Sequence, residues 1–552
     1  MAFSYSLIIV MEVLVLVPFF TYSLLASKQT SSVNLTKRKL NLVITALFIG
    51  SVILFLAPKL NLIYEYDYTK LTADSWAHYF VTKGWSDTGI LQTTNYPYYS
   101  TFPVTYAPQV ILHYMTGLSA FDSMTIYYLV AGIAGLLIIF GISREIIKGS
   151  ESEKMIFAGI AGVIYSFLQY FNLLFVQQYP LAIGMLAALF CVYSFALLAK
   201  RRKRAIIYLS ILAVLLTIAH PFASILVPIL FLVYFLLGRV KSVALNPYRG
   251  LISRRIALSM SAIIVVAGTM YMMFVVTDVF ENGVRWSELN VKYTWQKVTS
   301  QLVEETASGV GNSFEGRYQG YDAVIYPLNW ALPTATSASM VILFLFRRFH
   351  VSEDQVSLLL PLAIVSTFLF LLSFAFSFIE FAFSRYFGAY ALAFNIPVTA
   401  YLIYMVVVAR KTSNPLKTSI LRFALIGIMG LGVVSSVTDP TMLPKIGDES
   451  TLYRNTDIYP SELELIAWDD FYSYVGDEHR LIRTNLNGGP VQYFRHTHNY
   501  DNVIVSNTKN YTLTSDNAYL VIDKERLDLT TELQKNSYLD KVYDNSAIYV
   551  GR

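Results

Sequence analysis

The chain has 552 residues, of which 55% are hydrophobic and only 14% are charged, with a formal net charge of +5. Roughly a quarter of the residues in a soluble globular domain are charged, so this composition excludes an ordinary water-soluble protein. Segments of about 17 to 25 apolar residues can span a bilayer, and the sequence contains many of them. It therefore predicts a polytopic α-helical membrane protein.

We predict about twelve transmembrane helices. Their windows are 5–26, 40–60, 124–143, 155–174, 179–199, 205–219, 222–237, 256–276, 329–346, 356–377, 388–409 and 419–437. The first window is long, has no basic segment before it and contains Pro18, which favours a retained helix over a cleaved signal peptide. Together these windows form a transmembrane domain over residues 1–437.

Basic residues between the windows predict the orientation. They gather in alternate loops, at "KRK" (37–39), "KRRKR" (200–204), 239–255, "RR" (347–348) and "RK" (410–411). Cytoplasmic loops carry the excess of Lys and Arg, so these loops should be cytoplasmic. The N-terminus, the long loops 61–123 and 277–328, and everything after residue 437 should then be extracytoplasmic, in a plasma membrane.

The composition changes near residue 438, where turn signals such as "NGGP" and "YDNS" begin. Residues 461–475 have helical spacing, with Ser461 as a possible N-cap and Glu464 three positions later. Short strand-like runs follow: "RLIRT", "VQYF", "NVIVS", "AYLVID" and "KVYDNSAIYV", the last typical of a hairpin. This pattern predicts a small extracytoplasmic α/β domain over residues 438–552.

The first long loop contains "TADSWAHYF" (72–80) and "NYPYYSTFPVTYAP" (95–108). It is too long for a simple connection, and its tyrosine and proline content predicts an ordered loop with short helices along the membrane surface. A carboxylate there can meet the headgroup of a lipid-borne substrate without entering hydrocarbon.

These stretches resemble a known family. A span followed by "DSWAHY", then "YP", "FP" and "YAP", then "TG" (116–117), is similar to the first outer loop of the GT-C superfamily. "SRYFGAY" (384–390) resembles the Arg-Tyr pair late in many GT-C chains, and the outer C-terminal domain resembles that of archaeal members. The resemblance implies a membrane glycosyltransferase, active in protein glycosylation or at the cell surface, that takes sugar from a polyprenyl-phosphate carrier in an archaeal membrane.

The chain departs from the oligosaccharyltransferase branch of that family. The stretch "RLIRTNLNGGP" (480–490) lacks the "WWDYG" motif that reads the peptide acceptor there, and "LVEETAS" (302–308) only loosely resembles that branch's external-loop glutamate. We therefore expect transfer of a single sugar from the lipid carrier to an acceptor that the sequence does not identify.

The resemblance implies that Asp74 is the essential acid, as general base or as ligand of a divalent cation such as Mg²⁺ or Mn²⁺. The alternative is a carboxylate at the start of a loop helix. Asp67 would share a face with Asp74 if one helix continued through both. His78, four residues after Asp74, would share that face too, in a functional role or as a simple hydrogen-bonded pair.

Three candidates lie at outer helix ends. His220, in "AHPF", either ends a helix before Pro221 or faces the cavity of the site. Arg385 could hold the carrier phosphate with its planar guanidinium, or could anchor the helix at the membrane surface. Tyr386 is the second residue of the Arg-Tyr pair that the resemblance singles out.

The second long loop contains "RWSELNVKYTW" and "EGRYQGYD", mixtures that suit sugar recognition and an interfacial helix equally. Arg317 and Asp322 are its candidate substrate-binding residues. The basic loops are explained by topology, so we predict no nucleic-acid partner.

Two alternatives remain. A transporter would place ionisable or broken helical elements at mid-membrane, but the predicted spans contain few ionisable residues. A non-catalytic scaffold with an outer binding domain is compatible with motifs this short.

Overall fold

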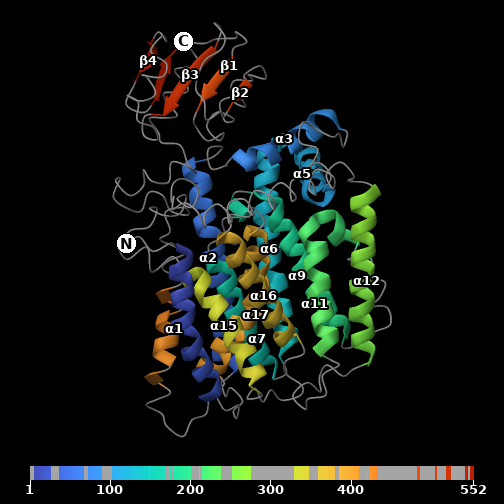
Figure 1. Ribbon diagram of the computed structural model, residues 1–552, viewed down its shortest axis with the longest axis vertical. Helices are drawn as coiled ribbons and strands as arrows, with labels where there is room; N and C mark the ends of the chain where they lie inside the picture. Colours follow the sequence, from blue (N-terminus) through green and yellow to red (C-terminus); the bar gives the residue numbers. More distant parts are fainter. Residues whose placement is uncertain are drawn as a thin grey trace, which may run out of the picture.

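The structure is a computed structural model of the chain (Figure 1). It describes residues 5–26, 37–66, 73–89, 102–147, 150–168, 174–176, 178–199, 211, 214–237, 251–274, 328–346, 358–378, 384–408, 419–420, 422–428, 430–431, 481–484, 504–506, 518–523, 541–544 and 548–551. For some of these residues, including Asp74 and Arg385, the description covers the backbone alone.

Most of the described chain is a helical bundle. Its helices are α1 (Tyr5–Ala26), α2 (Lys37–Tyr66), α6 (Ala120–Ile146), α7 (Glu151–Phe167), α9 (Pro180–Ala199), α11 (Pro221–Leu237), α12 (Leu251–Phe274), α15 (Leu328–Leu345), α16 (Leu359–Phe378) and α17 (Ser384–Ile403), which continues as the π-helix η4 (Tyr404–Val408). Each lies on a predicted window. The windows 205–219 and 419–437 also contain helical residues, at 214–219 and 422–428.

The helices are apolar enough for a membrane. Within the described residues, four segments are long and apolar enough to cross a bilayer: Asn41–Leu60, Ala120–Ile146, Pro180–Leu197 and Tyr386–Val407. Large apolar side chains such as Val15, Ile53 and Leu371 stay exposed on the bundle. Such a surface suits hydrocarbon rather than water, which supports a multi-pass membrane protein, while the count of twelve crossings stays a prediction.

A buried polar network joins α15 to α17. Asn395 donates through Nδ2 to the carbonyl of Pro333 at 2.7 Å and to the hydroxyl of Ser337. The hydroxyls of Thr336 and Thr399 lie 2.8 Å apart, and Thr399 also donates to Oδ1 of Asn395. Hydrogen bonds between membrane helices contribute about 0.6 kcal/mol each on average. This network therefore holds α17, and with it the first turn of that helix, against α15.

The first long loop supplies two helices, α3 (Ala73–Thr88) and α5 (Pro103–Thr116), as the sequence predicts. The fixed φ of Pro103 suits the first position of a helix. Gly117 ends α5 with a left-handed φ of 72°, which a residue without a Cβ adopts at no steric cost. Figure 1 shows both helices at one end of the bundle, below the sheet. We call this the α3–α5 end.

The C-terminal strands form a five-stranded sheet in the order β2-β1-β3-β5-β4. The strands are β1 (Leu481–Thr484), β2 (Ile504–Ser506), β3 (Ala518–Asp523), β4 (Lys541–Asp544) and β5 (Ile548–Gly551). β1 pairs in parallel with β2 and β3, whereas β5 is antiparallel to β3 and β4.

Four of the five predicted strand runs are confirmed, including the hairpin of β4 and β5. The run "VQYF" at 491–494 and the predicted helix at 461–475 lie outside the described residues. The α/β character of this domain, and its boundary near residue 438, stay predictions.

Candidate functional site

Helices α3 and α5 are joined by buried polar contacts. Nδ1 of His78 lies 2.8 Å from the hydroxyl of Tyr106. Thr82 donates to Oε1 of Gln109 at 2.6 Å, and Nε2 of Gln109 donates to the carbonyl of Thr105 at 2.7 Å. These side chains are all buried. The first two contacts join α3 to α5, and the third fixes the side chain of Gln109 within α5. The two helices therefore form one rigid unit that carries His78.

His78 also contacts the bundle itself. Its ring meets Tyr179 edge-on, with the ring centroids 6.3 Å apart, just before α9 begins. The hydroxyl of Tyr127, on α6, donates to the carbonyl of Val104 on α5 at 3.1 Å. The unit formed by α3 and α5 is therefore tied to α6 and to the start of α9.

His220 occupies the turn between helical residues 214–219 and α11. Its Nδ1 accepts a hydrogen bond from the backbone N–H of Phe222 at 3.3 Å, so in the neutral ring the proton sits on Nε2. The ring of Phe102 stacks on His220 at 6.3 Å, and the hydroxyl of Thr105 donates to the carbonyl of Ala219 at 3.5 Å. The start of α5 therefore packs on this turn.

The first turn of α17 meets the same turn. Tyr386 stacks on Phe222 with ring centroids 4.5 Å apart and an interplanar angle of 6°, and its ring lies 5.7 Å from that of His220. Arg385 precedes Tyr386 directly. Three segments distant in sequence, namely α5, the His220 turn and the start of α17, thus form one continuous aromatic cluster.

Helix α9 packs closely against that cluster at Gly184. A Cβ on Gly184 would lie 2.4 Å from Cβ of His220 and 2.8 Å from both Cγ of His220 and the hydroxyl of Tyr390. No real Cβ tolerates such distances, so the absence of a side chain at position 184 lets His220 and Tyr390 approach the helix.

Several buried polar atoms near the α3–α5 end have no hydrogen-bond partner among the described residues. They include the hydroxyls of Tyr128 and Tyr390 and Oε1 of Gln178. Leaving a buried polar atom without a hydrogen-bond partner costs about 1–3 kcal/mol of stability. Such atoms are therefore retained where another group supplies the hydrogen bond. Sequence reasoning missed these residues, because a tyrosine or glutamine beside an apolar run gives no signal of its burial.

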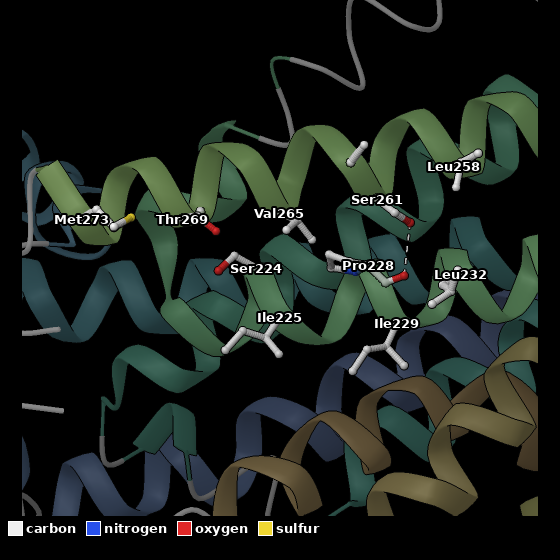
Figure 2. A pocket seen from close by; sticks show the side chains of 12 residues that line it. Ser224, Ile225, Pro228, Ile229, Leu232, Leu258, Ser261, Val265, Thr269 and Met273 are labelled. Atoms are coloured by element: carbon white, nitrogen blue, oxygen red, sulfur yellow. Dashed lines mark hydrogen bonds between the residues drawn. The ribbon is translucent and has the colours of Figure 1, made fainter. Parts of the chain in front are cut away.

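An apolar groove of about 690 Å³ runs between α11 and α12. Figure 2 shows Ser224, Thr269 and Met273 at one end and Leu232 and Leu258 at the other. Ser224 follows His220 by one helical turn, and Tyr271 on α12 lies beside Phe102 with ring centroids 6.5 Å apart. The Ser224 end of the groove therefore adjoins the aromatic cluster.

The structure describes some of the predicted site residues fully, some by their backbone alone, and some not at all. His78, His220 and Tyr386 all lie in this connected region, and all contact aromatic side chains. Asp74 is the second residue of α3, one turn before His78, and Arg385 is the second residue of α17. Asp67, Arg317 and Asp322 lie outside the described residues. A helix that continues from Asp67 to Asp74 therefore stays a prediction.

The resemblance also implies a possible divalent cation at Asp74. Within the described residues, no group of three His, Cys, Asp or Glu side chains could hold a metal ion. His78 stands one turn from Asp74, and its Nδ1 lies 2.8 Å from the hydroxyl of Tyr106. The cation stays a prediction.

No protein-family model matches the sequence, and a search of curated proteins found no match. In three dimensions the chain is similar to the oligosaccharyltransferase of Archaeoglobus fulgidus. Against its apo form the TM-score is 0.50 at 12% identity, covering 89% of this chain and 70% of that one. Against its complex with an inhibitory peptide and a dolichol-phosphate the TM-score is 0.52, with the same identity and coverage.

ArnT from Cupriavidus metallidurans, bound to undecaprenyl phosphate, gives a TM-score of 0.48 at 13% identity, covering 91% of this chain and 98% of that one. The similarity to the Archaeoglobus protein confirms the predicted GT-C-like fold. At such low identity, the similarity concerns the fold alone.

Proposed function

We propose that the chain is a membrane glycosyltransferase that moves a sugar from a polyprenyl-phosphate carrier to an acceptor at the outer face of the membrane. The observation that carries this proposal is the contact between the unit of α3 and α5, the His220 turn and the first turn of α17. It brings the segments of Asp74 and Arg385 to one end of the bundle. The Archaeoglobus protein of the same fold has been captured with a dolichol-phosphate, which supports a lipid carrier here.

In this proposal the reaction is a single displacement at the sugar carbon. Asp74 takes the proton of the acceptor hydroxyl while the oxygen attacks, and the carrier phosphate leaves as an anion. Arg385 binds that phosphate through its planar fork, so the developing charge meets a fixed cation. One displacement inverts the configuration at the sugar carbon. A product with the anomeric configuration of the donor would exclude this mechanism.

The α11–α12 groove is the proposed seat of the carrier's isoprenoid tail. Its volume lies within the roughly 300–1,000 Å³ typical of ligand pockets, and its lining is almost wholly apolar. A tail in this groove would bring its phosphate towards His220 and the first turn of α17, because the Ser224 end adjoins that region.

The charge pattern of the sequence supports the outer location. Lys and Arg gather in alternate loops, other than the long loop that contains α3 and α5, which favours a cytoplasmic place for those basic loops. The sheet lies at the α3–α5 end in Figure 1, which supports an extracytoplasmic domain over residues 438–552. In an archaeon this would be the cell surface.

The test uses the full-length protein in lipid nanodiscs with tritium-labelled dolichyl phosphomannose, dolichyl phosphoglucose and a dolichyl diphosphate sugar. A cell-envelope extract of the native organism supplies the acceptor, and transfer is measured as label leaving the lipid phase. We expect one donor to be consumed. A wild-type protein that consumes none of them contradicts the proposal.

Asp74→Asn should lower transfer by about 100-fold or more without affecting folding, since a general base is lost. The matched control is Asp87→Asn, because Asp87 lies on the same helix but is exposed and paired with Lys83 at 3.7 Å. The control should keep full activity. Equal transfer by both variants would remove Asp74 from the mechanism.

The same assay decides between the two roles of Asp74. Transfer that survives EDTA assigns a general base. Transfer that EDTA abolishes and Mn²⁺ restores assigns a cation ligand.

A further inference from the structure

Gln178 has a strained backbone. Its φ is +58°, and among the described residues it is the only one other than glycine with a positive φ. A side chain with a Cβ rarely adopts this conformation, and such residues gather at functional sites, where the surrounding structure holds them in place. Hydrogen bonds do so here: the N–H of Gln178 donates to the carbonyl of Phe175 at 3.3 Å, and the N–H of Tyr179 to that of Leu174 at 3.0 Å.

The side chain of Gln178 is buried, with 2% of its surface exposed. Its Nε2 donates to the hydroxyl of Thr125 at 2.9 Å. Its Oε1 is buried and has no hydrogen-bond partner among the described residues. One half of the amide is therefore fixed by α6, and the other half is an acceptor without a donor among the described residues.

Gln178 borders the candidate site. Tyr179, its neighbour in sequence, meets His78 edge-on, and α9 begins at the next residue. His78 is in turn one turn from Asp74 on α3. Oε1 of Gln178 thus belongs to the residue directly before Tyr179, whose ring contacts His78.

We propose that Oε1 of Gln178 accepts a hydrogen bond from a hydroxyl of the donor sugar. This inference rests on the proposed function. An amide oxygen binds groups that carry a proton, which a sugar offers in its hydroxyls. An ionised phosphate offers only acceptors, so it cannot satisfy Oε1. Gln178 therefore distinguishes the glycosylated carrier from the bare carrier, and the contact is lost once the sugar has been transferred.

The test compares two lipids on the full-length protein in nanodiscs: dolichyl phosphate, and the dolichyl-phosphate sugar that the wild type consumes. Affinities are measured by displacement of a tritiated lipid. The variant is Gln178→Gly, because glycine adopts a positive φ without strain, which offsets part of the cost of losing the buried side chain and its hydrogen bond to Thr125. We expect it to bind the glycosylated lipid about 3- to 10-fold more weakly and dolichyl phosphate as well as the wild type does.

Gln178→Asn serves as a second variant. Asparagine tolerates the left-handed conformation and keeps an amide, one methylene shorter, so its loss should be smaller than that of the glycine variant. A Gly variant that loses affinity for both lipids equally, or for neither, overturns the assignment while leaving the glycosyltransferase proposal intact. A wild-type protein that binds neither lipid overturns both.

Discussion

The substitution Gly184→Ala tests the contact between α9 and the His220 turn. The added methyl group would meet His220 at 2.4 Å and the Tyr390 hydroxyl at 2.8 Å, so His220 or the helix must move. Overpacking of a buried site costs about 1–3 kcal/mol. Alanine is favoured over glycine in a helix by about 1 kcal/mol, which offsets part of that loss.

Gly50→Ala is the matched control. Gly50 lies inside α2, and a Cβ there would meet nothing within 4 Å. Both substitutions gain the same helical preference, so the difference between the two variants isolates the packing cost of about 1–3 kcal/mol. Stability can be followed through Cys191, the single cysteine, which is fully buried and should react with a maleimide only when the bundle opens.

Gly184→Ala should therefore label faster than Gly50→Ala. Its transfer activity should fall by about 10- to 100-fold, because a displacement of about 1 Å in a positioning group can cost that much. If the two alanine variants label at the same rate and transfer equally well, α9 does not approach His220 as closely as described, and the reasoning about that turn fails.

Three further predictions use the same measurements. Tyr106→Phe should destabilise the protein by about 1 kcal/mol, because Nδ1 of His78 loses its bond, and faster labelling of Cys191 would show it. Tyr390→Phe should leave labelling unchanged or slow it, since its hydroxyl has no partner among the described residues; clearly faster labelling would contradict this. Asn395→Leu should raise the labelling rate and lower transfer, because it cuts the network that holds α17 on α15; unchanged values would show that packing alone fixes α17.

Local patterns in the sequence predicted much of the fold. Apolar runs of the right length coincide with the helices of the bundle, and alternation with turn residues located β1, β2, β3 and the final hairpin. The ends were less accurate, as for α17, which begins at Ser384 rather than near 388. A helix can extend beyond its apolar window where flanking polar residues continue the turn, and hydropathy does not report this.

The site was predictable only in part. His78 and Tyr386 stood out because they belong to motifs, and His220 because it precedes a proline at a helix boundary. For His220, α11 begins at the next residue, as the first alternative predicts, and the ring packs on Tyr386; a role facing the cavity of the site stays a prediction. Gly184, Tyr390 and Gln178 gave no signal, because their roles depend on segments brought together by the fold. The spacing of residues along one segment carries no information about such contacts.

The membrane around the groove limits how far the groove can select one lipid carrier over another. Outside the groove the isoprenoid tail is already in hydrocarbon, so entering the groove removes no apolar surface from water and yields little free energy beyond packing. The groove can therefore orient the carrier but cannot by itself select it. Selection falls to polar groups outside the groove: Arg385 would recognise any phosphate, and Oε1 of Gln178 only a carrier that still bears its sugar. A weak site for the tail combined with a sugar-dependent contact would bind the carrier that bears its sugar. It would release the bare carrier after transfer without a separate conformational step.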